Sequence, residues 1–176
     1  MSQTWKTVVC LFAALGAVAA AAPKLKSSWR NLDTLAAPVA KVAVIGFTRE
    51  LATRRLMEDE LAAEIRKNGG HAEQSYLTLP GDLPKDPETI KQKLGAAGFD
   101  GAAVVRLAGV SQEQSWDPGY LRTDTLVRIE TVVYSVNGVM IWTGLSESLN
   151  PGSVRSVIRG VAVAAGADMK KRNAIR

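Results

Sequence analysis

The side chains that most often perform catalysis are scarce in this sequence. The 176 residues contain one cysteine, Cys10, and one histidine, His71. These counts exclude zinc clusters, Cys/His nucleophile pairs, haem attachment and structural disulfides. His71 follows a glycine at an expected strand start and has no serine or cysteine at motif spacing, which favours a solvated histidine. We expect no catalytic, cofactor-binding or metal-ligating residues.

One expected helix carries a cluster of acidic residues. The cluster consists of Glu58, Asp59, Glu60 and Glu64. A single helix surface rarely supplies the converging oxygens that calcium needs. Arg54 and Arg55 lie one turn earlier, at spacings suited to ion pairs with the first carboxylate. We therefore expect a solvated, ion-paired helix face.

No glycine pattern predicts phosphate or nucleophile chemistry. Gly95, Gly98 and Gly101 have the wrong spacing for a dinucleotide fingerprint and lie between a helix and a strand, the reverse of the required order. Helix termination explains them better. The chain also has no Walker loop and neither the G-x-S-x-G nor the S-x-x-K motif of serine enzymes.

A polar segment at 111–123 contains two aromatic residues. Trp116 and Tyr120 flank a Pro-Gly pair in what we expect to be a solvated loop. Aromatic anchors are typical of contact surfaces, so we predict that Trp116, Asp117 and Tyr120 bind a partner. The alternative is that Trp116 folds back over the sheet edge as a lid. Trp142, by contrast, alternates along a strand and is expected in the core.

These residues depend on an alternation of strands and helices. Residues 41–47 form a compact apolar run that predicts a buried strand, and Thr48 is positioned to cap a helix from Arg49 to Lys67. The pattern repeats with a strand at 71–79, a helix that starts at Asp86-Pro87-Glu88, and a strand at 101–108. Consecutive crossovers imply parallel strands, and right-handed crossovers place both helices on one face if the strand order runs in one direction.

The C-terminal half predicts a hairpin and a closing helix. Residues 126–136 and 139–144 flank Asn137-Gly138, a pair that favours a type I′ turn. Asn150-Pro151 is positioned to cap the last helix. The fold class is therefore α/β: a βαβαβ unit with a C-terminal β-hairpin and a closing helix, forming a mixed sheet in a single domain.

The N-terminus predicts export. Lys6 precedes sixteen uncharged residues, and Ala19 and Ala21 offer an A-x-A cleavage motif. The uncharged run is shorter than the roughly 20 residues that span a bilayer. We divide the chain into a signal peptide (1–21), a linker (22–40), an α/β domain (41–169) and a basic tail (170–176). An uncleaved leader that tethers the protein to a membrane is the alternative.

The net charge of +5 is concentrated at the ends of the chain. Residues 34–154 carry 12 basic and 15 acidic side chains. A nucleic-acid-binding domain concentrates Lys and Arg on a folded face with aromatics between them, so we exclude nucleic acid as a partner. The basic ends suit anionic lipid or an envelope polymer, or form a solvated helix end.

A family resemblance is carried by short segments in a specific order. They are residues 27–30, 42–47, 54–59, 72–76 with Pro80, 99–101, 104–106, 130–131 with Tyr134, and 141–144. With these segments the chain resembles small bacterial cell-envelope lipoproteins of uncharacterised function, with an α/β fold like the N-terminal domain of TolB. This resemblance implies an envelope location and a non-catalytic role, with no functional residues to carry over.

One feature departs from this family. Such proteins carry a cysteine at the signal junction for lipid attachment, whereas Ala19 to Pro23 contain none, and Cys10 lies too early. The protein is then either soluble in the periplasm or tethered by its leader.

We expect a non-catalytic periplasmic accessory or binding protein that contacts an envelope protein or polymer through its sheet edge and the 111–123 segment. One alternative is a small-ligand binder or enzyme at the carboxyl ends of the parallel strands, near Thr48, Arg49 and Arg106. Another is a structural subunit of a ring-like envelope assembly. The sequence does not indicate the oligomeric state.

Overall fold

The computed structural model describes residues 22–33 and 36–176, apart from the side chains of Ser115 and Asp117. The predicted signal peptide, with Cys10, lies outside these residues. Within the described residues, one six-stranded mixed sheet and three α-helices form a single domain, which confirms the α/β class. The elements are β1 (Lys24–Arg30), β2 (Lys41–Phe47), α1 (Leu51–Lys67), β3 (His71–Gln74), α2 (Pro87–Ala96), β4 (Gly101–Asp117), β5 (Tyr120–Ser135), β6 (Met140–Leu149) and α3 (Val154–Lys171).

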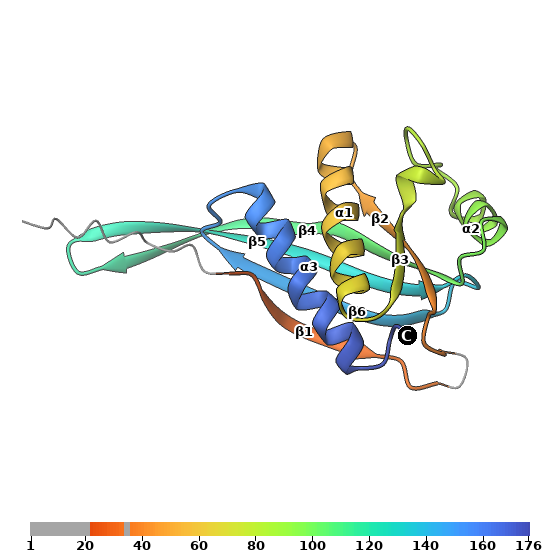
Figure 1. Cartoon of the computed structure of the whole chain (residues 1–176). Helices are drawn as coiled ribbons and strands as arrows, with labels where there is room; N and C mark the ends of the chain where they lie inside the picture. The colour runs from red at the N-terminus through yellow and green to blue at the C-terminus, as the bar shows by residue number, and fades with distance from the viewer. Residues whose placement is uncertain (1–21, 34–35) are drawn as a thin grey trace, which may run out of the picture.

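The strand order, β1-β6-β5-β4-β2-β3, places β2 between β3 and β4. Both pair with β2 in parallel, and the remaining neighbours are antiparallel. The chain moves from β2 to β3 in one direction and returns past β2 to reach β4. Right-handed crossovers in opposite directions put their helices on opposite faces. Accordingly, α1 and α3 cover one face and α2 covers the other (Figure 1).

The core therefore has two layers, one on each face of the sheet at β2. Val42 and Val44 pack toward α1 and α3, whereas Ala43 and Ile45 pack toward α2. A strand covered on both faces has no polar side, which explains its continuous apolar run. Trp142 is fully buried, as predicted, and its Nε1 donates to Oδ2 of Asp168 over 3.0 Å.

The predicted linker at 22–40 is wrong, because β1 lies within it and pairs with β6 along the sheet edge. Pro23 lies so close to α3 that a Cβ atom at Gly160 would overlap its ring. Arg30 donates from Nη2 to the carbonyl oxygen of Ala36 over 2.7 Å and from Nη1 to that of Ile141 over 3.2 Å. An edge strand exposed on one side needs few apolar residues, so its sequence resembles a linker.

The basic tail at 170–176 is also part of the fold. Helix α3 continues to Lys171, and Ala174 and Ile175 are buried in the main core. Ile175 forms a parallel bridge with Val39, and the amide of Arg176 donates to the carbonyl of Val39 over 3.0 Å. The end of the chain thus packs against the segment that leads into β2.

Helices α1 and α3 start at residues other than those predicted, because the predicted capping residues do not cap them. Thr48 Oγ1 accepts from the amide of Glu50 over 3.3 Å in a local turn, and α1 begins only at Leu51. Helix α3 is capped by Ser153 in a capping box with Ser156, rather than by Asn150-Pro151. The predicted start of α2 is confirmed, since Asp86 accepts from the amides of Glu88 and Thr89.

The β5–β6 hairpin is confirmed, but its turn is not type I′. Gly138 has a φ of +84°, whereas Asn137 keeps a negative φ. The amide of Gly138 donates to the carbonyl of Ser135 over 2.9 Å, and the register shifts between Val133 and Tyr134. This arrangement is typical of a type I turn followed by a left-handed glycine and a bulge.

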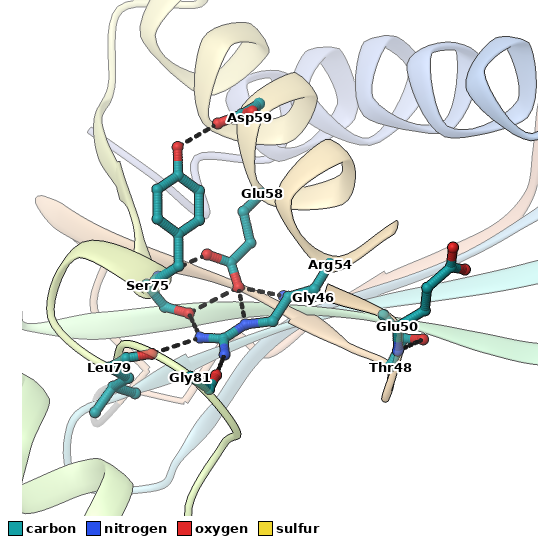
Figure 2. Close-up of polar contacts among 10 residues, drawn as sticks. Gly46, Thr48, Glu50, Arg54, Glu58, Asp59, Ser75, Leu79 and Gly81 are labelled. Carbon is teal, nitrogen blue, oxygen red and sulfur yellow. Dashed lines mark hydrogen bonds and ion pairs between the residues drawn. The ribbon is translucent and has the colours of Figure 1, made fainter. Parts of the chain in front are cut away.

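A buried ion pair replaces part of the solvated helix face that the sequence predicts (Figure 2). The side chains of Arg54 and Glu58 are 2% and 0% exposed, and Arg54 Nε donates to Glu58 Oε1 over 2.8 Å. Arg54 also donates to Ser75 Oγ and to the carbonyls of Leu79 and Gly81. Asp59, Glu60 and Glu64 instead bind partners at the surface.

Glu58 is equally well satisfied. It accepts from the amides of Gly46 (3.1 Å) and Tyr76 (2.8 Å) and from Ser75 Oγ (2.8 Å). A Cβ atom at Gly46 would lie 2.8 Å from the Arg54 carbonyl oxygen, so only glycine allows this approach. The segment that contributes Ser75 leaves the strand conformation for this contact, which ends β3 at Gln74 instead of residue 79.

We predict that Glu58→Ala lowers the free energy of unfolding by about 3–5 kcal/mol, because it leaves the Arg54 charge buried without its partner. Asp59→Ala, at the adjacent exposed position, should lower it by less than about 1 kcal/mol. Urea unfolding followed by circular dichroism measures both. Equal effects of the two variants would contradict a structural role for the buried pair.

Candidate functional site

The predicted loop at 111–123 is wrong, because β4 and β5 pair from Gly101 and Ser135 to Asp117 and Tyr120, with one bulge between Leu107 and Gly109. Pro118 and Gly119 form the turn, with a φ of +100° at the glycine. On either side the neighbouring strands end early, β2 opposite Arg106 and β6 opposite Leu126. Residues 112–125 therefore extend beyond both neighbouring strands as a two-stranded ribbon (Figure 1). Together with residues 107–111, which have lost β2 but still pair with β5, this ribbon is here called the arm.

The two faces of the arm differ in charge. Cross-strand partners share a face, and successive residues alternate between faces. One face begins with Val110, which pairs with Val127. Toward the tip it continues with polar uncharged residues and ends with the Trp116–Leu121 pair. Charged Glu113, Arg122 and Asp124 lie on the opposite face. The uncharged face consists of Val110, Gln112, Gln114, Trp116, Leu121, Thr123 and Thr125.

The tip presents Trp116 to solvent with 82% of its surface exposed, so the lid alternative is wrong. Leu121, directly opposite, is 49% exposed and shares its face. Tyr120 pairs with Asp117 and lies on the other face, so the predicted contact residues do not form one cluster. Leu121 is not among the contact residues that the sequence predicts. Two sequence signals together identify Leu121. Pro118-Gly119 is typical of a type II turn, and side chains alternate between the two faces of the strands on either side of it, which places Leu121 on the face of Trp116.

A groove of 750 Å³ lies at the root of the arm, on its uncharged face. Leu107, Val110 and Val127 form its floor, where β4 and β5 leave the cover of the helices. The first turns of α1 and α3 form its walls, with Thr53 and Val154 among the lining residues. The apolar surface of the arm thus continues into the groove, whose lining also includes the charged residues Glu50 and Arg106.

The alternative site predicted at the strand ends is only partly assembled. Thr48 and Arg106 line this groove, whereas Arg49 is not among its lining residues. The Arg106 guanidinium is paired, since Nε lies 2.6 Å and Nη2 2.5 Å from Oε2 of Glu130. The charge that would hold an anionic ligand is therefore neutralised by a neighbouring strand.

A second cavity of 410 Å³ lies between α2 and the sheet. Ile45, Leu94 and Phe99 are buried in its wall, and the ion pair between Glu88 and Lys91 (3.1 Å) lies on the α2 side. The size falls within the range of small-molecule pockets, but most of the wall is apolar. Such a cavity suits a mainly apolar ligand.

Asn150 fixes the root of the arm. Its backbone has a φ of +47°, and its amide donates to the carbonyl of Thr125 over 2.8 Å. Its Oδ1 accepts from the amide of Thr125 over 2.8 Å, and its Nδ2 donates to Asp124 Oδ1 over 2.6 Å. Hydrogen bonds from Asn150 and then Arg122 hold the pKa of Asp124 below its usual value. These hydrogen bonds therefore stabilise the folded protein at neutral pH, and this contribution is lost as the Asp124 carboxylate protonates on acidification.

Neither a metal-ligating cluster nor a membrane-spanning helix is present among the described residues. In residues 22–33 and 36–176, no three histidine, cysteine or acidic side chains converge at a distance that would hold a metal ion. In the same part of the chain, no helix has the length and apolar character needed to cross a bilayer. His71 is exposed, as predicted, and Gly98 ends α2 with a φ of +78°.

No protein-family model and no curated protein matches the chain, whereas solved structures do. The PelC dodecamer from Paraburkholderia phytofirmans is 13% identical, with a TM-score of 0.49 over 85% of this chain and 98% of that one. Lipoprotein GNA1162 from Neisseria meningitidis is 16% identical, with a TM-score of 0.45 over 74% and 96%. The hypothetical protein CT253 from Chlamydia trachomatis is 12% identical, with a TM-score of 0.39 over 74% and 96%. The resemblance to TolB stays a prediction.

We predict that Asn150→Gly loosens the root of the arm while keeping its backbone conformation, because glycine accepts a positive φ. The pKa of Asp124 should rise toward the usual value of about 3.9, and exchange of the Thr125 amide should accelerate about 5-fold or more. Nuclear magnetic resonance (NMR) titration and hydrogen exchange measure the two effects. Asn173→Gly, at the other asparagine with a positive φ (+53°), is the control and should change neither. Unchanged values in Asn150→Gly would contradict this role.

Proposed function

We propose that the protein is a non-catalytic binding protein of the bacterial cell envelope, exported by residues 1–21, and that it holds its partner on the uncharged face of the arm. The observation that carries this proposal is the Trp116–Leu121 pair, with Trp116 82% exposed at the end of a ribbon. Two-stranded ribbons are marginally stable in water, and large exposed aromatics are typical of contact sites. Burial against a partner would stabilise both.

The proposal of a non-catalytic role is supported by the burial of the polar side chains that converge. Arg54, Glu58 and Ser75 form the densest polar cluster described above, and all three are buried. Each of them bonds to a protein partner. Groups that are enclosed and satisfied in this way cannot touch a substrate.

The partner class follows from the same surface. A face with two glutamines, two threonines, a leucine and a tryptophan offers hydrogen bonds and apolar area without charge. Such a surface suits an envelope protein or a neutral envelope polymer better than nucleic acid, which requires cations. Membrane contact enters the proposal only if the leader is retained.

Binding of a small apolar ligand is a second candidate function, favoured by the cavity between α2 and the sheet. Its 410 Å³ would enclose part of a drug-sized or chain-like molecule. This site lies on the opposite face of the sheet from the groove at the root of the arm.

We predict that Trp116→Ala combined with Leu121→Ala lowers recovery of the partner from envelope extracts of the native host by about 10-fold or more, as expected for a contact hot spot. Leu32→Ala is the matched control, because Leu32 is 90% exposed outside the arm. Affinity capture with quantitative mass spectrometry measures recovery, and thermal unfolding confirms that all variants fold. Identical recovery by the double variant and the control would refute binding through the tip.

A further inference from the structure

The sheet has a vacant position beside the arm. Strand β2 pairs with β4 from Val42–Gly101 to Phe47–Arg106 and then turns away toward α1. Strand β4 continues to Asp117, so its outer edge at 107–117 has no neighbouring strand among the described residues. The groove at the root begins where β2 leaves, and Phe47 and Thr48 line it. A strand from another molecule would lie in line with β2.

The register shows which backbone groups face this position. The Thr125 amide donates to Oδ1 of Asn150, and the Thr125 carbonyl accepts from the Asn150 amide, so both backbone groups of Thr125 point away from β4. Along an antiparallel pair of strands, residues whose backbone groups point toward the partner strand alternate with residues whose backbone groups point away from it. Two residues that lie opposite each other always belong to the same kind. Gln112, which pairs with Thr125, therefore turns its backbone groups outward. The outward set along β4 consists of Val110, Gln112, Gln114 and Trp116.

Charge specifies what could fill the position. On the charged face, Glu113 lies opposite Asp124, and like charges in this arrangement are unfavourable. Asp124 is bound by Arg122 and Asn150, whereas Glu113 has no ion-pair partner in the part of the chain that the structure describes. A cationic side chain beside Glu113 would remove the imbalance. A second copy pairing antiparallel along the same edge would instead bring two Glu113 side chains opposite each other or one pair apart.

We propose that the partner contributes an extended segment that adds a strand to the outer edge of β4 at residues 110–116. Its backbone bonds to the outward amides and carbonyls, its uncharged side chains lie on the groove side, and a lysine or arginine lies beside Glu113. Strand addition obtains affinity from the backbone and specificity from alternate side chains. This inference rests on the proposed function and names the chemistry of its partner.

The first experiment uses the peptide Ac-Val-Thr-Val-Lys-Val-Thr-Val-NH2 as the probe and the 15N-labelled protein. We expect the amide signals of Val110, Gln112, Gln114 and Trp116 to shift, and their hydrogen exchange to slow about 10-fold or more on binding. The control peptide has glutamate in place of lysine and should bind at least about 10-fold more weakly. Absence of shifts, equal binding of both peptides, or shifts confined to the tip would overturn the proposal.

The second experiment compares two prolines at one cross-strand pair. Gln114→Pro removes an outward amide of β4, and Thr123→Pro removes the amide of its partner, which faces the opposite edge. We expect Gln114→Pro to abolish probe binding and Thr123→Pro to preserve it, with equal melting temperatures. Equal loss in both variants would overturn the proposal. Glu113→Lys should reverse the preference between the two peptides, and an unchanged preference would count against it.

The two proposals fail separately. If Trp116→Ala with Leu121→Ala lowers envelope capture while Gln114→Pro and Thr123→Pro capture alike, the arm binds its partner without strand addition. If the tip variants leave capture unchanged, the proposed function itself fails. Light scattering that shows a dimer dependent on residues 110–116 would also overturn the inference, because the second strand would then come from another copy.

Discussion

The buried pair of Arg54 and Glu58 is the constraint on which the arrangement depends. Two charges removed from water must have every donor and acceptor satisfied, and these two bind the end of β2, helix α1 and the segment after β3. Since Glu58 accepts from the Gly46 amide and the Arg54 backbone approaches Gly46 closely, the pair fixes where β2 ends. Because β2 ends there, β4 has no neighbour on its outer edge beyond Arg106 within the described part of the chain, and a groove opens beside it. The proposed binding surface is therefore a consequence of the buried ion pair.

Polar chemistry and exposed apolar surface are separated within this domain. The converging charged groups are enclosed near α1 (Figure 2), whereas Trp116 and Leu121 are exposed at the far end of the arm. Enzymes require the opposite arrangement, in which titratable groups line an accessible pocket. A binding protein requires apolar anchors within reach of its partner and a rigid scaffold behind them. The separation is the physical basis for proposing recognition instead of turnover.

The arm combines reach with order. Its root is fixed by Asn150 and by the pairing of Val127 with Val110, and its tip by the turn at Pro118-Gly119. A ribbon held at both ends presents backbone groups in the geometry that an added strand needs, so less conformational entropy is lost on binding. The edge lacks the lysine and proline residues that often prevent strand pairing, and Glu113 alone places a charge along the outer strand between Val110 and Trp116.

Local signals in the sequence determined the elements whose patterns are contained within them. The apolar run of β2, the Asp86-Pro87 start of α2 and the burial of Trp142 all follow from neighbouring residues, and together they establish the α/β class. Tertiary structure decided the rest, because those features depend on partners distant in the chain. Strand β1 becomes a strand only beside β6, and Glu58 is buried only because Gly46 and Ser75 approach it. The segment at 111–123 has the composition of a loop and becomes an arm because two long strands hold it in register. Composition records local preference, whereas strand pairing and charge burial are settled by contacts between distant segments.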